Sequence, residues 1–320
     1  MQTKPLMIRL MCLLLCLICA LPALAEEAAS RLVTLSGDPA ETFTAETNCY
    51  AKGDRVLVYF QKGVTVPGDT VAIVQNVMAE LEALTGLSFD NRWKVDHTNN
   101  YHLIFEEEVF DNLNPDGATV EVIIANLGTT SPYATENTGV IDVVDLEGPD
   151  RLALYHELAH VLYLRNAVDL GLCLDEGLAT WTLDKLYRQK AIPCWNTDFY
   201  LNGPDFDEAL ITGGEAGFSI CFEKSDDNYL YGFRFVTFLC ETYGEDVILR
   251  LIKAATEDGF DSSFQEDAAL ENKADTEHMK RILKSVTGED VFQRFAAWHE
   301  SEMPRVRQEY QDYIMPLIQE

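Results

Sequence analysis

The sequence is poor in basic residues. It has 24 Lys and Arg residues against 53 Asp and Glu residues, which gives a formal net charge of −29 at pH 7. An excess of negative charge on this scale repels nucleic acids and anionic membranes, and it keeps an exported protein soluble. The acidic residues are scattered along the chain, so we interpret the charge as general solubility rather than as a substrate signal. We expect no nucleic-acid partner. Internal repeats and low-complexity tracts are also missing.

The cysteines that follow residue 25 lack the spacing of a thiolate metal site. They stand at Cys49, Cys173, Cys194, Cys221 and Cys240, without a C-x-x-C pair. Because five is odd, at least one thiol has no partner within the chain. Bridges from Cys173 to Cys194 or from Cys221 to Cys240 are both compatible with the sequence. The uncharged surroundings of Cys173 argue against a cysteine nucleophile.

Only one long apolar run is present, over residues 10–21, and it is short for a membrane span. Lys4 and Arg9 precede it, and Ala23 and Ala25 offer small residues for cleavage, which is the pattern of a secretory signal. The sequence therefore predicts a signal peptide over 1–25, cleaved after Ala25, and a secreted or cell-envelope protein without stable membrane insertion. An uncleaved anchor is the alternative.

Two histidines and a glutamate stand at His156, Glu157 and His160. On a helix, residues four apart lie one above the other, so the two imidazoles face a common point that can hold a zinc ion. Glu157 lies about 100° further round the helix, where it can take a proton from water instead of binding the metal. Catalytic zinc takes three protein ligands, and Glu176 in the next helical stretch is the third candidate. Alternatively, both histidines are core residues and Glu157 is a surface carboxylate.

The flanks of this motif are apolar and uncharged from Leu152 to Leu162 apart from the motif itself, which indicates a buried helix. Asp150 is placed to cap its first turn.

At these residues the chain resembles the gluzincin branch of zinc metallopeptidases, the thermolysin-like and M1-aminopeptidase-like superfamily, and in particular its small secreted bacterial peptidase MA-like members. The resemblance rests on the HExxH motif, on the Asp-Glu-Gly-Leu-Ala run that contains Glu176, and on a later Tyr-Leu-Tyr-Gly-Phe run. It implies His156, His160 and Glu176 as ligands of one Zn²⁺ ion and Glu157 as general base. It also implies Tyr229 as a catalytic tyrosine, with Tyr231 as the competing choice.

The sequence departs from this family in three places. The spacer between His160 and Glu176 is shorter than in thermolysin, which requires a tight turn that Gly171 can provide. Thr180 stands where thermolysin-like proteins have an aspartate that supports a histidine, so Asp175 and Asp184 are both candidates for that role. The G-x-M-E-N motif of the M1 aminopeptidases is missing, which argues against aminopeptidase specificity.

Hydrophobic periodicity predicts the organisation of the chain. Strands are expected within 31–60 and at 101–105, 120–127 and 140–144, with an amphipathic helix over 71–84 that ends at Gly86. Helices are expected at 229–243, 246–256, 276–286 and 290–302. We divide the chain into 1–25 signal peptide, 26–66 β-rich extension, 67–190 catalytic lobe, 191–227 connector and 228–320 helical lobe. The predicted fold is α+β and zincin-like: a mixed β-sheet lobe whose helices carry HExxH, an all-helical C-terminal lobe, and the active site in the groove between them.

Tyr133 and Ala134 fall between two predicted strands. By the same resemblance they form a sheet edge along which a peptide substrate adds its backbone; an ordinary surface loop is the alternative. The sequence thus predicts a secreted zinc metallopeptidase that acts on peptides or proteins. The alternatives are an exported peptide- or cell-wall-binding protein with a structural or vestigial zinc site, and a zinc hydrolase acting on another amide or ester.

Overall fold

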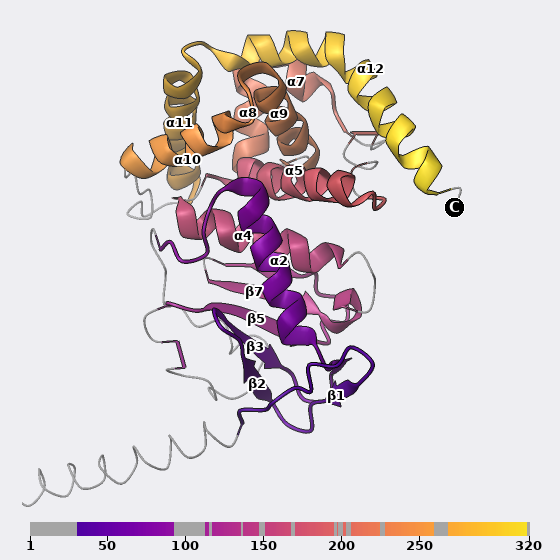
Figure 1. The fold of residues 1–320 in the computed structure, drawn as a ribbon. Helices are drawn as coiled ribbons and strands as arrows, with labels where there is room; N and C mark the ends of the chain where they lie inside the picture. The colour runs from indigo at the N-terminus through magenta and orange to yellow at the C-terminus, as the bar shows by residue number, and fades with distance from the viewer. Residues whose placement is uncertain are drawn as a thin grey trace, which may run out of the picture.

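The computed structural model describes the chain in several stretches that contain the sheet and the helices. They are residues 31–92, 113–114, 117–135, 137–146, 151–167, 170–194, 197, 201–202, 206–224, 228–258 and 268–318. The predicted signal peptide, the strand predicted at 101–105 and the capping residue Asp150 lie outside these stretches. Figure 1 shows the sheet at one end of the molecule and helices α7 to α12 at the other, with α4 and α5 between them.

Five strands form one mixed sheet in the order β2-β3-β5-β7-β6. The three inner strands run parallel, and each outer strand is antiparallel to its neighbour. Every residue of β3 and β5 is buried, as expected for inner strands covered on both faces. Strands β1 and β4 pair separately. The strands are β1 Thr42–Thr44, β2 Cys49–Lys52, β3 Val56–Phe60, β4 Thr65–Pro67, β5 Val120–Ala125, β6 Tyr133–Ala134 and β7 Thr138–Asp142.

The predicted division at residue 66 does not coincide with a break in the sheet. Strand β3, from the predicted extension 26–66, pairs with β5 along its whole length. The short segment after β7 forms a 3-10 helix, η1 Val143–Leu146, where the sequence predicted the end of a strand.

Helices α2 Thr70–Thr85 and α4 Leu152–Asn166 pack on the sheet, and α5 Leu172–Lys190 lies between them and the helical lobe. Helix α2 ends at Gly86 in the left-handed conformation, with φ of +73°, as the sequence predicted. Helix α4 follows Arg151, which has a φ of +46° and whose side chain makes no capping hydrogen bond.

The C-terminal lobe is helical, as predicted. It contains α7 Ala209–Thr212, α8 Glu215–Lys224, α9 Asn228–Tyr243, α10 Asp246–Asp258, α11 Ala268–Thr287 and α12 Val291–Leu317. The coarse prediction of a mixed-sheet lobe followed by helices is therefore confirmed. The segment 191–227, expected as a connector with little regular structure, contains α7 and α8. Its glycine pair, Gly213 and Gly214, separates these two helices, which are too short to show a clear hydrophobic period.

Helices α5 and α9 cross through two glycines. A Cβ atom on Gly177 would stand 2.5 Å from the carbonyl of Gly232, and one on Gly232 would stand 2.0 Å from the carbonyl oxygen of Cys173. Only glycine at both positions allows the two backbones to approach this closely. Because Gly177 directly follows Glu176, the crossing joins the sheet lobe to the helical lobe next to a predicted zinc ligand. Within the described stretches, none of the helices combines the length and apolarity that a membrane span needs.

Candidate metal centre

Helix α4 carries the two histidines of the motif one turn apart. The Nε2 atoms of His156 and His160 lie 3.0 Å apart, and the rings meet edge to face with their centroids 4.6 Å apart. His160 is buried, and the side chain of His156 is 13% exposed. The spacing of four residues thus brings both imidazoles to one point, as predicted.

Helix α5 brings Glu176 to the same point. Its Oε2 atom lies 3.1 Å from Nε2 of His156 and 3.2 Å from Nε2 of His160. The short connection from α4 turns at Gly171, which has a φ of +80°, and a Cβ atom there would stand 1.9 Å from the ring of Phe222. Both observations require glycine at this position, so the turn predicted at Gly171 is confirmed.

The separations of these three atoms fit a tetrahedral zinc ion. Ligand atoms about 2.0–2.1 Å from zinc at tetrahedral angles lie about 3.3 Å from one another. Here they are 3.0, 3.1 and 3.2 Å apart. In the described stretches of the chain, no further group of three or more His, Cys, Asp or Glu side chains converges in this way. An ion at this point would have two imidazole ligands, one carboxylate ligand and one position left for water.

Burial and charge shift the pKa values of the three groups in different directions. Burial opposes ionisation of Glu176, but hydrogen bonds and charge from His156 and His160 lower the pKa of its carboxyl to about 2. Burial lowers the pKa of His156. Burial acts in the same direction on His160, but Asp175 and Glu176 outweigh it and raise the pKa of His160 well above its usual value. The two carboxylates beside His160 thus favour a positive charge at this point.

Asp175 lies against the outer nitrogen of His160. Its Oδ2 atom is 3.0 Å from Nδ1, a contact that is an ion pair by distance without the alignment of a hydrogen bond. A carboxylate in this place fixes the ring and the tautomer of a ligand histidine. Asp184, the other candidate, accepts hydrogen bonds from Arg188 at 2.8 Å and from Thr197 at 2.9 Å instead. Of the two candidates, Asp175 is therefore the one that contacts His160.

Glu157 lies beside the cluster of His156, His160 and Glu176, but it does not contribute one of the three converging atoms. It is 6% exposed, and burial raises the pKa of its carboxyl to about 7. Strand β7 covers it, because a Cβ atom on Gly139 would be in contact with Cβ of Glu157 at 3.6 Å. The sequence contained no sign of this contact. A buried carboxyl with a pKa near neutrality is suited to accept and release a proton.

The two candidate tyrosines on α9 have different surroundings. Tyr231 is fully buried, with its ring 5.4 Å from that of Phe295 and 5.9 Å from that of Phe235. Tyr229 is 37% exposed and lies three residues before Gly232, on the face of α9 that meets α5. Tyr231 therefore belongs to the core of the helical lobe, and Tyr229 reaches solvent near the helix crossing.

The segment with Tyr133 and Ala134 is a strand at the edge of the sheet. This strand, β6, pairs with β7 only, and it also packs on α4. The described stretches of the chain show no further strand on its outer side. The expected sheet edge beside the histidine helix is therefore present.

Comparisons with known proteins give no assignment. No family model matches the chain, and no curated protein matches it. A functionally unknown conserved protein from Bacillus anthracis str. Ames is similar at 14% identity with a TM-score of 0.39, over 83% of this chain and 51% of that one. A mutant of a protein described in the same words is similar at 13% identity with a TM-score of 0.37, over 82% of this chain and 51% of that one. The chain spans about half the length of these structures.

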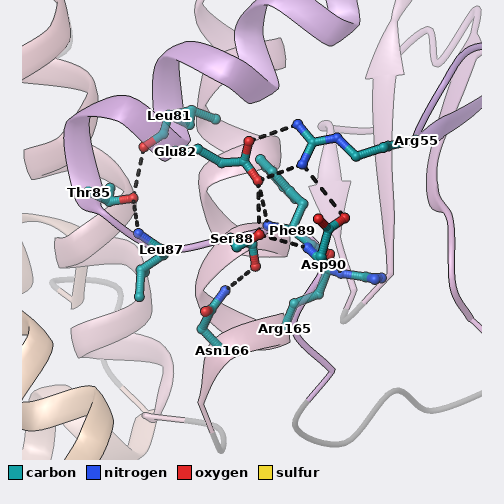
Figure 2. A network of polar contacts seen from close by, with 10 residues as sticks. All are labelled: Arg55, Leu81, Glu82, Thr85, Leu87, Ser88, Phe89, Asp90, Arg165 and Asn166. Atoms are coloured by element: carbon teal, nitrogen blue, oxygen red, sulfur yellow. Dashed lines mark hydrogen bonds and ion pairs between the residues drawn. The ribbon is translucent and has the colours of Figure 1, made fainter.

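The opposite end of α4 holds a polar network that was not predicted from the sequence (Figure 2). The fully buried guanidinium of Arg165 donates hydrogen bonds to the carbonyl oxygens of Phe89, Gly117 and Ala118 and to Oδ1 of Asn137. Asn166 donates to the carbonyl oxygen of Ser88 at 2.8 Å. In the sequence, only the apolar residues around Arg165 could have indicated that its side chain is buried and anchors the helix. Arg165 and Asn166 fix α4 to the segments before and after the central strand.

Proposed function

We propose that this protein is a zinc-dependent metallopeptidase of the gluzincin type, with His156, His160 and Glu176 as zinc ligands. The observation that carries the proposal is the convergence of the three ligand atoms to within 3.0 to 3.2 Å of one another. The ion-paired support of His160 by Asp175 adds to it, because catalytic zinc sites commonly have such a partner. The zincin-like arrangement of sheet, histidine helix and helical lobe belongs to the same proposal.

Glu157 is the general base in this proposal. Zinc in such a site makes water acidic enough to act as a nucleophile near neutral pH and polarises the carbonyl group under attack. The Glu157 carboxylate accepts the proton of the attacking water and then passes it to the leaving amine. Its burial under β7 supports this role, because the carboxyl is screened from bulk water and held in place.

Tyr229 is the proposed hydrogen-bond donor to the oxyanion that develops during attack. Its exposure and its place beside the α5–α9 crossing support this choice over Tyr231, which is enclosed by phenylalanine rings. The edge strand β6 is the proposed binding rail, where the backbone of an extended peptide pairs with Tyr133 and Ala134. The N-terminal sequence supports export, so the proposed substrates are peptides or proteins outside the cytoplasm.

A metal assay combined with a peptide library tests this function. The purified protein is analysed for zinc content and then incubated with a mixed peptide library, with and without a chelator. We expect about one zinc ion per chain, and peptide cleavage that stops on chelation and returns with added zinc. Bound zinc without cleavage of any peptide would favour the binding-protein alternative. Cleavage that survives complete removal of metal would refute the metallopeptidase.

A further inference from the structure

The first turn of α5 exposes a leucine beside the proposed zinc ligand on this helix. Leu172 begins the helix and is 52% exposed, whereas the two residues after it are buried. On a helix, residues three and four apart are neighbours, with Cβ atoms about 5–6 Å apart. Leu172 therefore lies one turn before both Asp175 and Glu176, on the face of α5 from which these two carboxylates reach His160.

A second exposed apolar side chain lies at the same end of α9. Helices α5 and α9 run in the same direction, because their crossing at Gly232 lies near both starts and Lys185 pairs with Glu245 towards both ends. Tyr229 stands one turn before Gly232, at the end of the helix pair where Leu172 begins α5. The side chain of Tyr229 is 37% exposed.

These two side chains flank the proposed ligand. Isolated apolar side chains are common on protein surfaces and need no function. Leu172 and Tyr229, however, stand in the first turns of two packed helices, at the end that carries Glu176. Glu176 follows Leu172 by one turn and directly precedes the glycine crossing with α9. A zinc ion held by Glu176 would therefore have exposed apolar surface next to it.

The size of this surface fits one side chain of a ligand rather than a protein partner. A stable protein interface takes about 800 Å² from each partner, contributed by about 20–30 residues. Two partly exposed side chains provide only a small part of that area. They are large enough to cover a leucine or aromatic side chain of a bound peptide, and removing that side chain from water stabilises the complex.

We propose that Leu172 determines substrate specificity by contacting an aliphatic or aromatic side chain next to the bond that is cleaved, with the ring of Tyr229 beside it. This inference rests on the proposed function, because the zinc site defines which bond is cleaved. The favoured substrates are peptides with leucine, isoleucine, methionine or phenylalanine at one of the two residues that flank this bond. Acidic residues are disfavoured there, because the Asp175 carboxylate lies one turn from Leu172.

The residue preference of cleavage tests this inference. The zinc-loaded protein and its Leu172→Asn and Leu249→Asn variants are incubated with a mixed peptide library, and mass spectrometry identifies the residues on both sides of each cleaved bond. We expect apolar residues at one of these positions roughly 10-fold above their frequency in the library, and loss of this preference in Leu172→Asn. Leu249, 42% exposed on α10, is the matched control and should keep the preference. A preference that is absent from the parent, or unchanged in Leu172→Asn, would overturn the inference.

Binding of two hydroxamic acids gives a readout that does not need hydrolysis. A hydroxamate supplies oxygen ligands to the open position of a zinc ion, and leucine hydroxamate differs from glycine hydroxamate only by an apolar side chain beside that group. By calorimetry on the zinc-loaded protein, leucine hydroxamate should bind roughly 10-fold more tightly. This ratio should fall below about 3-fold in Leu172→Asn and persist in Leu249→Asn.

The zinc content of the parent protein separates the two ways to fail. A parent that binds no zinc would refute the proposed function and this inference with it. A parent that binds zinc and takes both hydroxamates with equal affinity would overturn the inference alone.

Discussion

The two ends of helix α4 bury polar side chains in different ways. At the C-terminal end, the side chains of Arg165 and Asn166 donate to backbone carbonyl oxygens and to an amide oxygen, and each donor has a partner of fixed position. Figure 2 shows the bonds to Phe89 and Ser88. At the N-terminal half, His156 and His160 have as neighbours mainly each other and two carboxylates. The first arrangement is complete without a ligand. This end therefore anchors the helix, whereas the arrangement at the other end would be completed by the proposed zinc ion.

Replacing a ligand should have the largest effect. His160→Ala removes one of the three ligand atoms, so zinc affinity should fall roughly 10³-fold or more and peptide hydrolysis should disappear. The free energy of unfolding of the metal-free protein should change little. The carboxylates around His160 attract its ring but also repel one another, so the two effects offset each other. Zinc titration and chemical unfolding measure the two quantities. His278→Ala is the matched control, because His278 is also buried beside a carboxylate but lies in the helical lobe. Equal zinc loss in both variants would contradict the assigned ligand.

Replacing an anchor residue should reverse this pattern. Arg165→Met leaves three carbonyl oxygens and the Asn137 amide without a donor in a buried place, which should lower the free energy of unfolding by about 3–5 kcal/mol. The folded fraction should still bind zinc, because Arg165 does not contact the cluster. Chemical unfolding and zinc titration are again the measurements. Arg188→Met, on a half-buried arginine paired with Asp184, should cost about 1 kcal/mol. A fall in zinc affinity without a loss of stability would show that Arg165 is not an anchor.

Replacing Asp175, which contacts the proposed ligand His160, should have a smaller effect on zinc affinity, and this effect should depend on pH. Asp175→Asn should weaken zinc binding roughly 10–100-fold at high pH, because the carboxylate no longer fixes His160. Asp175 also raises the pKa of His160, and a proton there competes with the metal. Apparent zinc affinity should therefore rise with pH in both proteins and level off at a lower pH in the variant. Zinc titrations across a pH series would show this; identical profiles for the two proteins would argue against a role for Asp175.

The position of the two histidines and several elements around them could be predicted from the sequence. The spacing of His156 and His160 was sufficient to place both rings at one point, since helix geometry is local. The strands at 56–60 and 120–125 and the stop of α2 at Gly86 followed from periodicity and from the conformational freedom of glycine.

The anchor could not be predicted, because it depends on contacts across long sequence separations. Arg165 bonds to Phe89 and Gly117, which lie in segments that carry no motif. The choice of Asp175 over Asp184 and the cover that Gly139 gives to Glu157 depend in the same way on how helices and strands pack. Helices α7 and α8 escaped detection because they are short and flanked by glycine.

The role of Glu157 can be measured most directly by changing it to glutamine. Glu157→Gln keeps the shape of the side chain but removes the proton acceptor, and Glu157 is not one of the three converging ligand atoms. Zinc content is measured together with peptide hydrolysis, and Glu300→Gln, at an exposed position on α12, serves as the control. We expect the Glu157 variant to retain about one zinc ion per chain and to lose hydrolysis by roughly 10²–10⁴-fold, while the control keeps both. Full hydrolysis in the Glu157 variant, or loss of its zinc, would contradict the assignment of Glu157 as the base beside a zinc site.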